Sequence, residues 1–369
     1  MTVHFKRVDN TGPNATLGGL MKMRKIAWLM VILALSPVAV ATDRVAERLE
    51  NGLLYRLVDS EDIHRMENPG FVSQGLAQSY MGEFEPVLGV VRGEFTRAYP
   101  TWLLEGFSVI NDKIDGFPIV VTWSPFSFSG AVYGRVVDGD TLQFEDSGEL
   151  WKDALVMVDK KTNSRWSHLE GRALDGPMKG KRLEPHNSLY TKWGKWRSLY
   201  PYTVCLTKLG REVEKSDFVN YYARSGQLGA ANSQNPDSRL AGKELICGFK
   251  INGTPVAVPL YALVEKKQFR LTVDGSPIEI EFDQLSETAV VFSRVLGNDT
   301  LSLTRLDFGK GESYLRLAEN GTTWLNYSGL GVSGPQSETA LDMITSTLCF
   351  WFVWVQHYPN TQLWEQPGE

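Results

Sequence analysis

The chain has 369 residues, of which 43% are hydrophobic and 22% charged, and its formal net charge at pH 7 is −5. This length and composition allow about two buried cores and exclude a disordered or fibrous protein. The acidic balance lacks the excess of basic residues that neutralises phosphates, so we expect no nucleic-acid partner. The three cysteines, Cys205, Cys247 and Cys349, are too few for a disulfide scaffold. Cys205 and Cys247 could pair in an oxidising compartment, but three buried small hydrophobic side chains are the favoured interpretation.

Residues 1–41 form an N-terminal extension and a signal for export. Basic residues precede an almost unbroken apolar run at residues 26–41, which ends in Ala39-Val40-Ala41. A basic region, a short apolar run and small residues at its end are the pattern of a cleaved signal peptide. A membrane span needs about 20 apolar residues, more than this run supplies. We therefore predict a mature chain that starts near Thr42, with an uncleaved anchor formed by residues 26–41 as the alternative.

Residues 42–86 form a lead-in segment, which we expect to be helical at residues 44–54. Residues 87–207 then contain short apolar runs bounded by turn residues, a pattern typical of strands. The pair Asp138-Gly139 between two such runs predicts a β-hairpin. A second hairpin is predicted at residues 154–168, where two apolar runs flank a polar turn.

A short amphipathic helix is predicted at the end of this region. Leu189, Trp193, Trp196 and Leu199 recur at helical spacing, and Pro201 stops the run. Residues that recur at this spacing lie on one face of a helix, so the two tryptophans are expected to fill a core.

Residues 208–243 are rich in Gly, Ser, Asn and charges, and we interpret them as a connecting segment. Residues 244–369 then repeat the pattern of residues 87–207, at an offset of 159 positions that becomes 158 after one deletion. The matched pairs include Ala98 and Ala257, Pro100 and Pro259, Asp115-Gly116 and Asp274-Gly275, Arg135-Val136 and Arg294-Val295, Trp166 and Trp324, Trp193 and Trp351, Trp196 and Trp354, and Tyr200-Pro201 and Tyr358-Pro359.

This repeat predicts an α+β fold that is mostly β, made of two tandem copies of one β-rich module, each closed by a short C-terminal helix. The second closing helix, within residues 348–358, is apolar nearly all round. We expect it to be buried between the two modules.

Several motifs follow one another in the first copy and just before it. They are Glu85-Pro86-Val87-Leu88-Gly89-Val90, Arg97-Ala98-Tyr99-Pro100, Asn111-Asp112, Trp166-Ser167 and Gly176-Pro177. In this order they resemble the bacterial DUF3179 family, whose function is unknown, and the resemblance runs from about residue 67 to the C-terminus. It implies two DUF3179-like modules in an exported protein of the bacterial envelope, located in the periplasm once the signal is removed.

The resemblance also implies a site that this chain has lost. Many members of the family read Thr-Tyr-Cys-Pro-Leu-Cys where this chain reads Thr122-Trp123-Ser124-Pro125-Phe126-Ser127. Cysteine pairs form redox disulfides or bind soft metals, whereas serine hydroxyls do neither at neutral pH. The histidine of the family's Trp-His-Glu stretch is replaced within Gly106-Phe107-Ser108, and the second copy has Asp283 and Ser286 at the two cysteine positions.

Five residues are candidates for ligand binding in a degenerate site: Ser124, Ser127, Trp166, His168 and Glu184. The serines lack the first glycine of a Gly-x-Ser-x-Gly elbow, so hydroxyls that satisfy backbone groups are the favoured interpretation. His168 and His186 lack a third ligand nearby in sequence, and Trp166 recurs as Trp324, which favours a core position. We therefore predict no catalytic residue, no metal site and no cofactor.

The favoured hypothesis is a non-catalytic exported protein that binds a small ligand or an envelope protein on the surface between its two halves. An enzyme, or a redox- or metal-handling protein, that acts at the Ser124-Pro125-Phe126-Ser127 loop is the alternative. A third possibility is a structural envelope component held in the membrane by residues 26–41, the one case in which we expect membrane contact.

Overall fold

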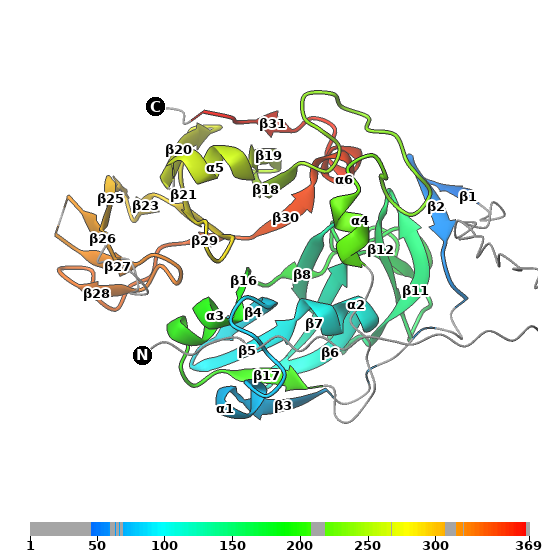
Figure 1. Cartoon of the computed structure of the whole chain (residues 1–369), viewed down its shortest axis with the longest axis horizontal. Helices are drawn as coiled ribbons and strands as arrows, with labels where there is room; N and C mark the ends of the chain where they lie inside the picture. The colour runs from blue at the N-terminus through cyan, green and yellow to red at the C-terminus, as the bar shows by residue number, and fades with distance from the viewer. Residues whose placement is uncertain are drawn as a thin grey trace, which may run out of the picture. The chain divides into compact units, whose positions relative to one another are not determined.

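The computed structural model describes residues 46–59, 63, 66, 69–207, 218–266, 268–306, 315–319 and 321–366. The predicted signal, residues 1–41, lies outside the described residues. Strands predominate over helices in the described part, which confirms the mostly β character of the α+β prediction (Figure 1). No helix in that part is long and apolar enough to cross a membrane.

One sheet of the first half is built around the hairpin of β4 and β5. Its strands, in pairing order, are β16 (Ser188–Lys192), β4 (Pro86–Arg92), β5 (Phe95–Pro100), β17 (Val204–Thr207) and β3 (Gly70–Ser73). Helices α1 (Gln74–Ala77), α2 (Thr101–Gly106) and α3 (Trp193–Leu199) follow β3, β5 and β16. The predicted closing helix is therefore present as α3, and it packs on β4 and β16.

Two further sheets and a small hairpin complete the first half. One sheet pairs β15 (Glu184–Pro185), β8 (Ser129–Gly134), β7 (Phe117–Ser124) and β6 (Val109–Ile114), and the other pairs β1 (Ala46–Leu49), β2 (Gly52–Arg56), β11 (Phe144–Trp151), β12 (Ala154–Asp159), β13 (Arg165–Ser167) and β14 (Arg172–Ala173). The hairpin joins β9 (Val136–Val137) to β10 (Asp140–Thr141) through Asp138 and Gly139, whose φ values are 51° and 85°. Both predicted hairpins are thus confirmed, the second as β12 and β13.

The helix predicted at residues 44–54 is wrong in the described part. β1 and β2 form a hairpin there, with Glu50 in a left-handed conformation at the turn. β2 also pairs with β11, and Leu54 packs on Trp151 in a small buried cluster. Pairing with a distant strand has overridden the local helical tendency, because sheet hydrogen bonds and burial outweigh weak propensities.

The second half has sheets with the same strand order as the first. One pairs β30 (Ser346–Phe350), β18 (Leu245–Ile251), β19 (Thr254–Pro259) and β31 (Gln362–Leu363), and another pairs β20 (Gln268–Val273), β21 (Ser276–Asp283), β22 (Thr288–Ser293) and β29 (Met343–Ile344). The others pair β25 (Leu303–Leu306), β26 (Leu315–Ala318), β27 (Thr323–Leu325) and β28 (Gly331–Ser333), and β23 (Val295–Leu296) with β24 (Asp299–Thr300). Helices α5 (Leu260–Lys266) and α6 (Trp351–His357) follow β19 and β30, as α2 and α3 follow β5 and β16.

Individual contacts also recur in the two halves. Trp196 Nε1 of α3 donates a hydrogen bond to Thr203 Oγ1 at 2.8 Å, and Trp354 Nε1 of α6 donates to Thr361 Oγ1 at 3.0 Å. Each tryptophan ring lies against a glycine of the adjoining sheet, Gly89 in β4 or Gly248 in β18. A side chain at either glycine would overlap the ring, so both positions require glycine.

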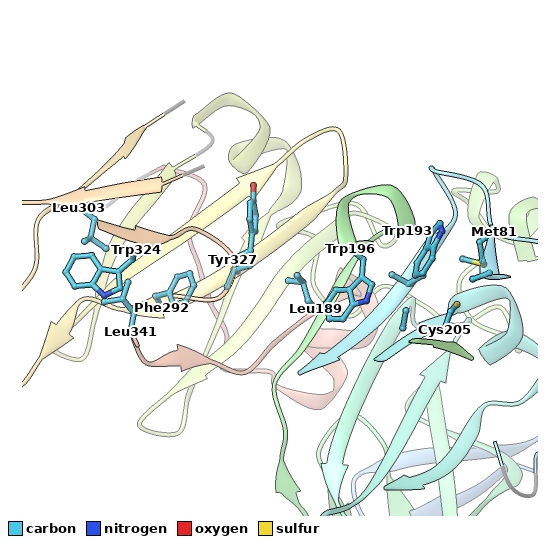
Figure 2. Packing of buried hydrophobic residues seen from close by; sticks show 14 of the residues in the cluster. Met81, Leu189, Trp193, Trp196, Cys205, Phe292, Leu303, Trp324, Tyr327 and Leu341 are labelled. Carbon is cyan, nitrogen blue, oxygen red and sulfur yellow. The ribbon is translucent and has the colours of Figure 1, made fainter. Parts of the chain in front are cut away.

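The predicted core tryptophans are buried. Trp166, Trp193, Trp196, Trp324 and Trp351 are 0% exposed and Trp354 is 3% exposed. One apolar cluster extends from Met81 and Cys205 through Leu189 to Phe292 and Trp324 (Figure 2). This cluster joins the two halves, because Met81, Leu189 and Cys205 belong to the first half and Phe292 and Trp324 to the second. The three cysteines are all buried and unpaired, as the favoured interpretation predicted.

The predicted connecting segment contributes to the core in its described part, residues 218–243. It contains α4 (Phe218–Ala223), in which the Tyr221 hydroxyl donates to Phe126 O at 2.8 Å. Helix α6 is buried as predicted and packs against the first half: His357 Nδ1 lies 3.0 Å from Glu170 Oε1, and Gln356 Nε2 donates to Asp153 Oδ2 at 2.9 Å. Burial of an almost wholly apolar helix therefore holds the halves together.

Gly89→Ala tests this packing. The new methyl group would overlap the ring of Trp196, so we expect the free energy of unfolding in urea to fall by about 1–3 kcal/mol, the usual cost of overpacking. Gly75→Ala in α1 is the matched control, because nothing lies within 4 Å of a Cβ built there. Equal stability of Gly89→Ala, Gly75→Ala and the natural protein would contradict the packing described.

Candidate functional site

The turn between β7 and β8, residues 124–129, contains the loop singled out from the sequence. The Ser127 amide donates to Ser124 O at 3.2 Å, and Phe128 adopts a left-handed conformation with φ of 52°. The turn is attached to the second half, because the Phe350 amide at the end of β30 donates to Ser127 O at 2.9 Å. β30 also contacts β8, and the two strands are labelled close together in Figure 1. The turn is thus fixed by partners from both halves.

A chain of buried polar groups lies beneath this turn. Ser127 Oγ is 2.7 Å from Ser129 Oγ, which is 3.1 Å from His168 Nε2. His168 Nδ1 is in turn 3.1 Å from Thr122 Oγ1. The four side chains are 0% exposed. Buried polar groups require hydrogen-bond partners, and this chain supplies them mutually.

Either neutral tautomer of His168 satisfies the chain. With a proton on Nδ1, the ring donates to Thr122, which donates to Ala131 O, while Ser127 donates to Ser129 and Ser129 to Nε2. With a proton on Nε2, the ring donates to Ser129, Ser129 donates to Ser127 and Ser127 donates to Ser124 O, while the Thr122 hydroxyl donates to Nδ1 in place of Ala131 O. Burial lowers the pKa of His168 to about 3, so the ring is neutral at physiological pH.

Ser129 and His168 have the spacing of a nucleophile and its base, but their surroundings do not favour catalysis. A nucleophilic serine needs a base that is itself oriented by a third group, usually a carboxylate, and it must reach the substrate. Here His168 Nδ1 meets the hydroxyl of Thr122, and both members of the pair are fully buried. The arrangement supports the interpretation that these hydroxyls stabilise the fold.

The second half places different groups at the matching positions. Ser286 Oγ lies 2.7 Å from Thr288 Oγ1, as Ser127 does from Ser129. The positions matched to Thr122 and His168 hold Glu281 and Asn326, and Asn326 Nδ2 donates to Glu281 Oε2 at 2.9 Å. Burial raises the pKa of Glu281 to about 7, although the charge of nearby Arg316 opposes the rise.

A small cavity of about 130 Å³, here called the loop pocket, opens beside the turn. Ser108, Ser124 and Asp146 line it, together with Glu105 and aromatic side chains that include Trp123. Ser108 and Ser124 lie in the two stretches where the family resemblance implied a histidine and a cysteine. Burial raises the pKa of Asp146, and hydrogen bonds from Gly148 and Ser108 oppose this. No group of three His, Cys, Asp or Glu side chains among the described residues could hold a metal ion.

A larger cavity of about 270 Å³, here called the central pocket, lies between the two halves. β8 and residues 169–170 contribute one wall, and β18, β29, β30 and α6 contribute the other. The walls are mostly apolar, and the larger side chains on them include Tyr133, Glu170, Phe249, Lys250, Trp354 and Tyr358. Pockets of this kind, apolar with a few polar groups, are typical of small-molecule sites.

Glu170 is the acidic side chain of this pocket, and its partners hold it in the ionised form. Its carboxylate accepts hydrogen bonds from His357 Nδ1 at 3.0 Å and Arg172 Nε at 3.2 Å. Burial alone would raise the pKa of Glu170, but the hydrogen bond from His357 and the charge of Arg172 lower it to about 2. Glu170 therefore fixes the wall formed by α6 and has little capacity left for a ligand.

The structure brings together three of the five candidate residues. Ser124 lines the loop pocket, and Ser127 and His168 belong to the buried chain beneath it. Trp166 lies in a separate core, where its Nε1 donates to Asp159 Oδ2 at 3.0 Å. Glu184 is exposed on β15, which pairs with the far end of β8.

The sequence predicted a binding surface between the two halves but did not identify the residues of the central pocket. Its residues come from strands and a helix that are distant in the chain and belong to no shared motif. One signal was present: Lys250 follows the repeated glycine Gly248 by two positions, where the first copy has apolar Val91 after Gly89. A charged residue at a position whose counterpart in the other half is apolar indicates a position outside the core.

Comparison with family models matches residues 60–361 to the family described as Protein of unknown function (DUF3179). The chain belongs to the DUF3179 family. The match begins in the lead-in segment and continues through both halves, so the family resemblance noted in the sequence is confirmed. Neither the curated proteins nor the solved structures give a match. The family description assigns no activity, and any function for this DUF3179 protein must be argued from its residues.

His168→Gln tests the neutral buried state of the histidine. The folded-state pKa of about 3 lies below the ordinary value of about 6.5. Between these two values the unfolded chain binds a proton at this histidine and the folded chain does not. The free energy of unfolding therefore falls as the pH drops below about 6.5. Between pH 7 and pH 5 we expect His168 to account for a loss of about 2 kcal/mol, which the variant avoids.

Urea unfolding of both proteins at the two pH values measures this difference. His186→Gln is the comparison variant, and we expect it to change the pH dependence less, because His186 is only partly buried. If His168→Gln leaves the natural pH dependence intact, His168 is not the neutral group described here.

Proposed function

We propose that this DUF3179 protein is an exported, periplasmic binding protein that holds a small organic ligand in the central pocket without transforming it. The observation that carries the proposal is a cavity of about 270 Å³ with mostly apolar walls supplied by both halves. Its volume is close to the lower end of the roughly 300–1,000 Å³ range of small-molecule sites. The groups that resemble catalytic ones, Ser129 and His168, are sealed away from it.

We infer further that the two halves are tandem copies of one module, with boundaries near residues 87–207 and 244–369. The repeated residues support this inference, as do the matching strand orders and the matching contacts of Trp196 and Trp354. A pocket between two copies can acquire walls that differ in chemistry, because each copy is free to change at matched positions. Lys250 and Val91 are such a pair.

A redox, metal-handling or catalytic function at the loop of residues 124–127 remains the second candidate. The loop pocket favours it, since Ser124, Ser108 and Asp146 converge there. Their chemistry favours it less, because neutral hydroxyls are poor nucleophiles and poor ligands for soft metals. The central pocket is the larger of the two cavities and has more apolar surface for a ligand.

Export is tested by the start of the mature chain. We expect N-terminal sequencing of the protein from a soluble periplasmic fraction to begin near Thr42, because Ala39-Val40-Ala41 ends the predicted signal. A chain that retains residues 26–41 and is recovered only with membranes would contradict the prediction and support an anchored envelope component.

Ligand binding is tested with benzyl alcohol, a small neutral aromatic probe, in ligand-observed NMR titrations. We expect saturable binding by the natural protein and at least a tenfold loss in Ser188→Phe, because Ser188 lines the central pocket and a phenyl group would occupy it. Ser198→Phe, on the exposed side of α3, is the control and should bind like the natural protein.

Urea unfolding of both phenylalanine variants verifies that they are folded. Binding that persists unchanged in a folded Ser188→Phe protein would place the probe elsewhere and remove the support for this site.

A further inference from the structure

The central pocket has a positive charge that no described acidic side chain neutralises. Lys250 lines the pocket from β18, and its Nζ lies 5.1 Å from the ring centroid of Tyr358. Among the described residues, no carboxylate lies within ion-pair distance of its ammonium group. Lys250 is therefore a cation on the wall of a mostly apolar cavity, without an ion-pair partner among the described residues.

Arg182 adds a second charge on the same side. Its backbone is bridged to Arg172, two residues from Glu170 of the pocket wall. The charge of Arg182 acts on Tyr133, Tyr358 and Lys250, which all line the pocket. Partial burial lowers the pKa of Lys250, and repulsion from Arg182 lowers it further. Arg182 itself is exposed and lies outside the pocket lining, so an anion bound at Lys250 would relieve this repulsion.

Glu170 does not supply that anion. Its oxygens accept from His357 and Arg172, and Arg172 also pairs with Glu50 at 2.9 Å. The positive charges of its partners therefore largely compensate the negative charge of Glu170. The remaining effect of Glu170 is to raise the pKa of Lys250, against the lowering by burial and Arg182. The rim near Lys250 keeps a positive balance while the rest of the cavity is apolar.

We propose that the ligand of the central pocket is a small organic anion, a carboxylate on an apolar or aromatic body, with its charge at Lys250 and Arg182 and its body against Phe249, Trp354 and Tyr358. This inference rests on the proposed binding function and names its ligand class. A carboxylate forms a charge-assisted hydrogen bond with the Lys250 ammonium group, and the charge of Arg182 attracts it from outside the pocket lining. Aromatic side chains supply the apolar contact area that a flat body requires.

The experiment compares three probes that share one ring: benzoate, benzyl alcohol and benzylamine. NMR titrations at low ionic strength give the affinity of each for the natural protein. We expect benzoate to bind about tenfold more tightly than benzyl alcohol, and benzylamine to bind most weakly, because a charge-assisted hydrogen bond adds to the contact of the ring.

Two variants identify the cations. Lys250→Gln should weaken benzoate about tenfold and leave benzyl alcohol unchanged, with a smaller loss for benzoate in Arg182→Gln. Lys113→Gln, at an exposed lysine of β6 outside the pocket lining, is the control and should not alter either affinity.

The outcomes separate the two proposals. Equal affinity for benzoate and benzyl alcohol, with both lost in Ser188→Phe, would overturn the ligand class and retain the binding function. Tighter binding of benzylamine would also overturn the class. Absence of binding by all three probes would overturn the binding function itself.

Discussion

The attachment of β30 to the turn of residues 124–129 is the interaction on which the rest of the structure depends. The Phe350 amide donates to Ser127 O, and Thr347 Oγ1 donates to Gly130 O at 2.9 Å. These bonds fix the turn over the His168 chain and hold β30 in place as part of the wall of the central pocket. β30 continues directly into α6. Helix α6 then buries its apolar side chains against both halves. If β30 were released, the core would open, the pocket would lose a wall, and the groups beneath the turn would meet water. The shape of the central pocket and the stability of the fold therefore depend on the same few contacts.

The interiors of the two halves show how one architecture tolerates different chemistry. Met157 and the residue matched to it, Arg316, are both 0% exposed. In the first half the methionine packs in an apolar core, whereas the guanidinium of Arg316 lies 3.5 Å from Glu281 Oε1. Burying an unpaired charge is costly, so an arginine is tolerated there because carboxylates accompany it. The need of buried polar groups for a partner also accounts for the pairing of Asn326 with Glu281. The corresponding pair in the first half is His168 with Thr122. The two halves thus fill corresponding interior positions with different pairs of polar side chains that contact each other.

The sequence predicted those elements that depend on local rules. Asp138-Gly139 fixed a hairpin because both residues readily adopt positive φ, and Pro201 marked the end of α3. The tryptophans were placed correctly in the core because bulky apolar side chains repeated at matched positions seldom remain exposed. The hairpin of β1 and β2 was missed because its stability comes from pairing with β11, nearly a hundred residues later. A binding surface between the two halves was predicted, but the residues of the central pocket were not, because β8 and β30 are distant in sequence and no local pattern reports their contact. Ser127 and His168 were named as candidates from separate motifs, and only the fold shows that they belong to one buried hydrogen-bonded chain.

The distribution of polar groups favours holding a ligand over converting one. Catalysis needs a reactive group at the surface of the cavity, with a pKa tuned to exchange protons near neutral pH. In this protein the hydroxyl groups of Ser127 and Ser129 and the imidazole of His168 are enclosed, and burial holds the imidazole neutral. The cavity that is open to a ligand is lined by aromatic rings, by Glu170 whose hydrogen bonds are already used, and by Lys250. A lysine of this kind attracts charge and orients a ligand without bond formation. The buried hydroxyl and imidazole groups are thus kept apart from the apolar cavity, an arrangement that suits the proposed binding function. It arises because the second half covers the turn of residues 124–129.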